Sequence, residues 1–289
     1  MKLILAIFIM SHFLWSSEVE LEIVGSGGPE LDGRASTSYI LWIDKQAKLV
    51  VDMGSGSMLG FERSGGKLET LDVVVLTHLH IDHSVDLPSF AKAGFFSQRK
   101  DALDIIGPSG NTYFPSIEEY LQTLFGPNGA YRYMQDILTT KSDSFQIVPL
   151  SLDSDEVMIK KYNDFTMKLI SVHHGIVPAL ALRIDIGEKA IVISGDTSNK
   201  DRALEKITKN ADIFIAHHAI PEHTGKFAKR LHMTPSIIGD IARDAKVKQL
   251  ILTHRMNRTQ RHEKESLKII KERFKGKIIF AEDGMKIKF

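Results

Sequence analysis

The sequence of 289 residues contains no cysteine, which excludes disulfide frameworks, thiolate metal sites and a cysteine nucleophile. It also lacks an excess of either charge, because 37 lysine and arginine residues face 36 aspartate and glutamate residues. A net charge of +1 gives no general reason to bind nucleic acid or an anionic membrane. The sequence has no repeat, low-complexity tract or linker, so we expect one globular domain with a large core.

The long hydrophobic run of the sequence lies at the N-terminus, at positions 3–15 after a single lysine. It has the length of a signal-peptide core and is shorter than the roughly 20 residues of a membrane span. We therefore expect 1–17 to be a signal peptide, 18–289 to be a single folded domain, and the protein to be periplasmic or secreted without a membrane span. The residues before Ser16 and Ser17 are large for a cleavage site. A buried first strand of a cytoplasmic protein or an uncleaved membrane tether is the alternative.

Short β-rich runs come first in the chain and later alternate with amphipathic segments, while 84–165 is mixed and loop-rich. The expected strands are 19–25, 38–43, 48–52, 72–76, 165–172, 179–186, 190–194, 212–216 and 249–253. The expected helices are 84–95, 117–125, 202–209, 235–244 and 263–274. This order predicts an α/β fold in which two sheets pack together with helices outside.

Histidine is the unusual residue, because eleven of the 12 histidines follow position 77. Positions 77–83 read THLHIDH directly after an apolar strand. His78 and His80 are two apart, so in extended backbone they point to the same side and can hold a cation such as zinc. Asp82 and His83 follow on the same loop. Four ligand-type residues exceed what one ion takes from one loop, which predicts two ions side by side.

Other strand ends offer further ligands. His173 and His174 follow the strand at 165–172, Asp196 follows the strand at 190–194, and His254 follows the strand at 249–253. A rigid sheet edge positions side chains in this way around a metal. Because a carboxylate has two oxygens, Asp196 can bridge two ions.

The motifs resemble those of a known superfamily. THLHIDH resembles the T-H-x-H-x-D-H signature of the metallo-β-lactamase superfamily, and SGDT at 194–197 and LTH at 252–254 resemble its later metal motifs. GSGGP at 25–29, the VVDMGSG segment and HGIVPALALRID at 174–185 resemble the branch of ribonuclease Z and the arylsulfatase-like hydrolases. The resemblance runs from about residue 19 to the C-terminus and implies an αββα sandwich of two mixed β-sheets flanked by helices.

The same resemblance implies the ligand set. His78, His80 and His174 would hold the first ion. Asp82, His83 and His254 would hold the second, with Asp196 between the two ions. We expect two Zn²⁺, although manganese and iron tolerate the same donors.

Two adjacent cations lower the pKa of a bridging water, and the resulting hydroxide suits hydrolysis of a phosphodiester, sulfate ester, lactone or amide. Asp82 can also orient the water. His232 resembles the histidine that ribonuclease Z-like enzymes place near the leaving group, which predicts a proton donor; a helix-capping role is the alternative. Arg255 and Arg258 follow His254 and are candidates for binding an anionic substrate.

Two features depart from ribonuclease Z. The strand at 212–216 is followed by His217 and His218 instead of an acidic residue, so the roles of both, and of His173 and His223, stay open. The interval from His174 to Asp196 is only 196 − 174 = 22 residues, too short for the arm that the tRNA-processing enzymes insert there.

These observations predict an exported dinuclear hydrolase that cleaves an ester of a small molecule, with sulfate or phosphate esters preferred. The alternatives are a ribonuclease Z-like phosphodiesterase, a lactonase or β-lactamase-type hydrolase, and a metal-holding binding protein. Nucleic acid is not an expected partner, because the basic excess at 246–277 lies largely on an amphipathic helix, where it is typical of a solvated face. The sequence leaves a homodimer open.

Overall fold

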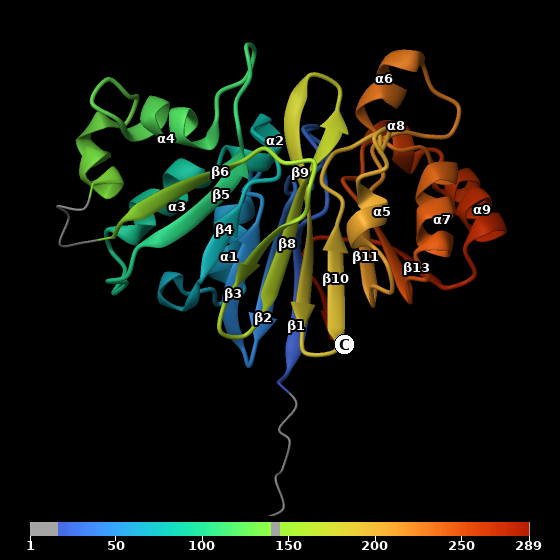
Figure 1. Cartoon of the computed structure of the whole chain (residues 1–289), viewed down its shortest axis with the longest axis horizontal. Coiled ribbons are helices and arrows are strands. Elements are labelled where there is room, and N and C mark those ends of the chain that lie inside the picture. Colours follow the sequence, from blue (N-terminus) through green and yellow to red (C-terminus); the bar gives the residue numbers. More distant parts are fainter. Residues whose placement is uncertain (1–16, 140–144, 289) are drawn as a thin grey trace, which may run out of the picture.

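The computed structural model describes residues 17–139 and 145–288, in which two seven-stranded sheets pack face to face (Figure 1). The first sheet contains, in spatial order, β14 (Met285–Lys288), β1 (Val19–Gly25), β2 (Ser38–Ile43), β3 (Gln46–Val51), β4 (Val73–Val75), β5 (Leu103–Pro108) and β6 (Ile147–Leu152). The second contains β13 (Lys277–Phe280), β12 (Gln249–Thr253), β11 (Ile213–His217), β10 (Lys189–Ile193), β9 (Val177–Ile186), β8 (Thr166–His174) and β7 (Met158–Lys161).

Helices cover the outer face of each sheet (Figure 1). Those on the first sheet and its loops are α1 (Ser57–Arg63), η1 (Leu68–Thr70), α2 (Ile81–Ser84), α3 (Leu87–Gly94), α4 (Ile117–Phe125) and η2 (Arg132–Leu138). Those on the second are α5 (Leu204–Ile207), α6 (Lys226–Leu231), α7 (Pro235–Asp244), α8 (Asn257–Gln260) and α9 (Glu263–Arg273). The predicted sandwich of two mixed sheets flanked by helices is confirmed.

Three apolar layers hold this arrangement together. Alternate residues of the strands, such as Leu41 and Leu182, fill the space between the sheets. The opposite faces pack against helices, through Phe90 of α3 on one side and Ile270 of α9 on the other. Each sheet therefore buries both of its faces, which explains why the central strands are nearly continuous apolar runs.

Both sheets are antiparallel in one half and parallel in the other. Strands β3 to β6 run parallel in the first sheet, and β10 to β13 run parallel in the second. Because parallel strands have their carboxyl ends at one edge, the loops after β3, β4, β10, β11 and β12 can meet there. Figure 1 shows β10 running toward the side of the sandwich on which α2, the helix that follows β4, lies.

The stretch at 84–165 differs from the sequence prediction, because it contains three strands as well as helices. β6 carries Pro149, which is tolerated because β6 lies at the edge of its sheet, and β7 is a short, half-exposed edge strand. The helix expected at 84–95 is divided into α2 and α3, with Pro88 in the first turn of α3.

No helix among the described residues is long and apolar enough to cross a membrane. The expected signal peptide at 1–17 lies, except for its last residue, outside the described residues and stays a prediction.

Candidate metal centre

Strand ends from both sheets bring the predicted ligands to one edge of the sandwich. His78 follows β4, His174 is the last residue of β8, Asp196 follows β10, and His254 follows β12. All four side chains are buried. The turn at 25–29 covers this edge so closely that a Cβ on Gly28 would lie 2.8 Å from Cε1 of His254. A glycine is therefore required in this turn.

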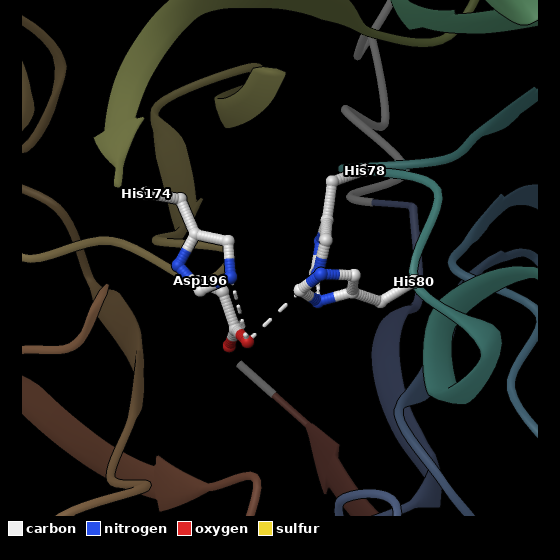
Figure 2. A group of neighbouring side chains, drawn as sticks. All are labelled: His78, His80, His174 and Asp196. Atoms are coloured by element: carbon white, nitrogen blue, oxygen red, sulfur yellow. Dashed lines mark hydrogen bonds and ion pairs between the residues drawn. The ribbon is translucent and has the colours of Figure 1, made fainter. Parts of the chain in front are cut away.

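The first group of side chains consists of His78, His80, His174 and Asp196, whose ligand atoms all lie within 4.8 Å of one another (Figure 2). Nε2 of His78 lies 3.0 Å from Nδ1 of His80 and 3.9 Å from Oδ2 of Asp196. Nε2 of His174 lies 3.8 Å from the same oxygen. Three imidazoles and one carboxylate that converge in this way can hold a divalent ion.

A second group converges on the same oxygen of Asp196. Nε2 of His254 lies 3.2 Å from Oδ2 of Asp82 and 3.4 Å from Oδ2 of Asp196. Nε2 of His83 lies 3.5 Å and 3.8 Å from the same two oxygens. The structure thus brings together the residues that the sequence assigns to a second ion.

His217 also lies in this second group. Both of its nitrogens already have partners, since Nδ1 lies 2.7 Å from Oδ1 of Asp196 and Nε2 lies 2.9 Å from the hydroxyl of Tyr39. A ligand nitrogen needs a free lone pair. Asp82, His83, His254 and Asp196 could hold a second ion, while the contacts of His217 to Asp196 and Tyr39 favour a supporting role for His217.

The two oxygens of Asp196 have different surroundings. Oδ1 faces His217, whereas Oδ2 lies between 3.4 and 3.9 Å from five imidazole nitrogens. These nitrogens belong to His78, His83, His174, His232 and His254. Asp196 is thus the residue that both groups share, as expected for a bridging carboxylate.

Other residues fix the orientation of two of the imidazoles. Nδ1 of His83 lies 2.8 Å from Oδ2 of Asp52, and Nδ1 of His174 donates to the carbonyl of Leu231 at 2.8 Å. Such contacts to the distal nitrogen fix the tautomer of a metal-binding histidine, so that Nε2 presents its lone pair.

Unpartnered buried nitrogens show that these residues fit a metal. Nε2 of His83, Nε2 of His174 and both ring nitrogens of His254 are buried without a hydrogen-bond partner. Leaving such groups unpaired costs about 1–3 kcal/mol each. Cations bound by the lone pairs of these Nε2 atoms would satisfy them, one by His174 in the first group and one by His83 and His254 in the second. The donor set of imidazole and carboxylate suits zinc and also admits manganese or iron.

The charges of the site favour a cation as well. Burial alone would lower the pKa of His83, but Asp52, Asp196 and Asp82 raise it to about 9. Burial alone would raise the pKa of Asp82, but the adjacent imidazoles of His254 and His83 lower it to about 2. The lowered pKa values of Asp82 and Asp196 keep both carboxylates ionised, and they stabilise positive charge at the position between the histidines.

His232 lies beside both groups, as the residue that ends α6. Its Nδ1 is 3.8 Å from Oδ2 of Asp196, has no hydrogen-bond partner and is buried. Its ring centroid is 5.2 Å from that of His174. Burial, with a smaller contribution from the charge of His254, lowers its pKa to about 3. Its side chain makes no capping hydrogen bond to α7, which begins at Pro235.

Arg255 does not have the role expected from its position next to His254. Its guanidinium is buried and is engaged by the carboxylates of Glu263 and Glu282 and by the carbonyl of Ala281. These contacts hold the segment after β12 against α9 and the loop that connects β13 to β14. The expectation that Arg255 binds substrate is therefore corrected.

Arg258 is close enough to the site for its charge to influence His232. Its Nε donates to the carbonyl of Ala219 at 2.6 Å, and no described carboxylate forms an ion pair with it. Burial is the main cause that lowers its pKa, against the charges of Glu30 and Asp196. Its own charge contributes to the lowered pKa of His232. Arg258 is exposed and forms no ion pair with a described carboxylate, so its guanidinium is available for an anion.

The histidines left open by the sequence lie at different places. His173 is paired with Ser198, His218 is buried against Ser266 behind the site, and His223 is exposed near Glu265. Only His217 joins the centre. Asp52 is the other residue that the sequence analysis missed. Its position directly after an apolar strand was the available signal.

Comparisons with known proteins agree with this geometry. The solved structure of YhfI from Bacillus subtilis, a metallo-β-lactamase fold protein, is 21% identical, with a TM-score of 0.74 over 95% of this chain and 100% of that chain. The human tRNase Z, short form, is also 21% identical, with a TM-score of 0.71 over 93% and 98%. Ribonuclease Z of Clostridium kluyveri is 25% identical over 80% of this chain and 86% of that protein.

The fold is therefore the metallo-β-lactamase fold, and the chain is a metal-dependent hydrolase that acts on ester bonds. The family described as "Anti-Pycsar protein Apyc1" matches residues 19–273, and the chain belongs to that family.

Proposed function

We propose that the chain hydrolyses a phosphodiester of a small organic molecule at a centre of two ions, most simply zinc. The observation that carries the proposal is the guanidinium of Arg258, whose charge acts on His232 and which forms no ion pair with a described carboxylate. A phosphodiester supplies the tetrahedral anion that a guanidinium binds with two parallel hydrogen bonds.

Each of the surrounding residues has a place in this reaction. His78, His80, His174, Asp82, His83, His254 and Asp196 would hold the ions. The chemistry that two divalent ions supply in such a site is Lewis acidity and the activation of water at neutral pH. Arg258 would bind a non-bridging phosphate oxygen. With its pKa lowered to about 3, His232 is neutral, and it would act on the departing alkoxide as a donor through its remaining ring N–H; its place beside Asp196 supports this role.

The interval between His174 and Asp196 supports a small substrate. It consists of β9, β10 and the tight turns around them, so it has no inserted arm that would grip a folded RNA. A precursor tRNA is the second candidate substrate, and the ribonuclease Z relatives favour it. Sulfate esters, which we also expected from the sequence, share the tetrahedral anion. We also propose that the protein is exported, and this proposal rests only on the sequence of the expected signal peptide at 1–17.

A substrate panel tests the proposal. Metal-loaded protein would be assayed with bis(p-nitrophenyl) phosphate, 3′,5′-cyclic mononucleotides, an aryl sulfate, a lactone, a β-lactam and a precursor tRNA. We expect turnover of the small phosphodiesters, with the aryl sulfate slower. Exclusive cleavage of the tRNA, of the sulfate or of the acyl substrates would contradict the proposal. Substitution His78→Ala serves as the metal-site control and should abolish any genuine activity.

A further inference from the structure

Behind the metal ligands, a chain of buried polar groups connects the two sheets. It begins at Tyr39 of β2 in the first sheet and passes through His217 of β11 in the second, and it ends on Asp196 after β10. Tyr39 is fully buried, and the exposed fraction of His217 is 1%. Thr253 adds a contact, with its Oγ1 3.3 Å from the Tyr39 hydroxyl. Buried groups paired in series in this way are strongly directional.

The hydrogens of this chain follow from the carboxylate at its end. An ionised carboxylate can only accept, so Nδ1 of His217 donates to Oδ1 of Asp196 over 2.7 Å. In an imidazole with one proton, Nε2 is then an acceptor, and the Tyr39 hydroxyl donates to it over 2.9 Å. Tyr39 thereby selects the tautomer in which His217 can hold Asp196.

This tautomer of His217 fixes the orientation of the Asp196 carboxylate. With Oδ1 engaged, only Oδ2 is directed at the surrounding imidazoles. The ring of His217 also lies against those of His83 and His254, with centroids 5.8 and 5.2 Å away. Its backbone amide is 3.1 Å from Oγ of Ser194, two positions before Asp196. His217 is thus fixed in position by the same segment whose carboxylate it orients.

We propose that His217 is a positioning residue, which together with Tyr39 holds Asp196 so that a single oxygen joins the two metal positions. It is not itself a metal ligand. This inference rests on the proposed metal centre but not on the proposed substrate, so metal binding can test it separately from the panel of esters.

The test uses the full chain loaded with Co²⁺, whose absorption spectrum reports ligand number and geometry. The substitution His217→Leu removes the N–H donor and keeps a side chain of similar volume. His217→Asn keeps an N–H near the place of Nδ1. Tyr39→Phe keeps the ring and removes only the hydroxyl. Thermal unfolding of the metal-free proteins establishes that each variant folds.

We expect His217→Leu to bind two Co²⁺ with an affinity lowered about 10- to 100-fold, the effect typical of losing an outer contact to a metal ligand. Its spectrum should change, and kcat should fall more than KM rises. His217→Asn should recover most of the affinity, and Tyr39→Phe should show a smaller change in the same direction.

Two outcomes would overturn the proposal. If His217→Leu folds and keeps the affinity and spectrum of the unaltered protein, His217 has no positioning role. If both His217 variants bind one Co²⁺ fewer and asparagine rescues nothing, His217 is a ligand. Failure of every ester in the substrate panel, with these metal results intact, would count against the proposed function only.

Discussion

Nδ1 of His83 lies 2.8 Å from Oδ2 of Asp52, and both side chains are fully buried. Asp52 also accepts from the backbone amide and the hydroxyl of Thr77, at the start of the THLHIDH motif. One carboxylate therefore fixes both an imidazole of the second group and the loop that carries the first. Asp52, after β3 of the first sheet, thus orients the candidate ligand His83, just as His217 of the second sheet orients Asp196.

Substitution Asp52→Asn should weaken metal binding about 10- to 100-fold, because the amide group cannot accept from Thr77 and His83 together. Asparagine tolerates the positive φ of 61° at this position, so the backbone should remain in place. Metal competition with a chromogenic chelator measures the affinity. Asp44→Asn is the matched control, since Asp44 is exposed and also has a positive φ, of 50°. Equal affinities of the two variants would refute the role of Asp52.

Substitution Arg258→Ala should raise KM for a phosphodiester about 10- to 100-fold, as expected for a lost charged hydrogen bond worth about 1.5–3 kcal/mol. Metal content should stay unchanged, because Arg258 touches none of the ligands. Steady-state kinetics and metal analysis check both points. The exposed neighbour Arg261 provides the control Arg261→Ala, which should leave KM as it was. A KM that does not move in Arg258→Ala would remove this residue from the substrate site.

Substitution His232→Gln should lower kcat about 10²- to 10⁴-fold for a substrate with an alkoxide leaving group, since a proton donor is lost. A p-nitrophenolate leaving group needs no proton, so the loss on that substrate should be much smaller. Comparison of the two kcat ratios in one variant separates proton donation from damage to the fold. Equal losses on both substrates would show that His232 has another role.

His218 makes stability depend on pH. Burial, with a smaller contribution from the charge of Arg255, lowers its pKa from 6.5 to about 4. Between pH 6.5 and about pH 4, His218 is protonated in the unfolded chain but stays neutral in the folded chain. The free energy of unfolding therefore falls as the pH drops through this window, by about 1.4 kcal/mol per pH unit from this residue.

Urea unfolding near both ends of the window measures this contribution. His218→Gln, whose amide can still reach Ser266, should show a shallower fall in unfolding free energy than the unaltered protein. His223→Gln is the control for the same substitution at an exposed histidine. A pH dependence unchanged by His218→Gln would contradict the buried neutral state of His218.

The convergence of candidate ligands at one edge could be predicted from the sequence because several of them come shortly after apolar strands, whereas their division between two ions came from the family resemblance. An apolar strand stops, and a histidine or aspartate comes next, as at Asp196 after β10 and His254 after β12. The antiparallel strands β1 and β2 were predictable for the same reason, from short apolar runs between glycine-rich turns. The local sequence pattern is therefore sufficient to predict a site residue where the end of a strand alone determines the position of its side chain.

Residues whose role depends on a distant partner were not predictable. Asp52 is 31 positions from His83, and His217 is 21 from Asp196, so no spacing rule connects them. Arg255 shows the opposite failure. It follows a ligand in the sequence, but Glu263 and Glu282 draw its side chain away from the site.

The ratio of metal to protein in the purified chain tests the central claim most directly. Elemental analysis after exhaustive dialysis should find about two divalent ions per chain. His80→Ala and His83→Ala, which each remove a ligand from one group only, should each bind about one fewer ion. A chain that retains no ion, or variants that retain as many as the unaltered protein, would contradict the account.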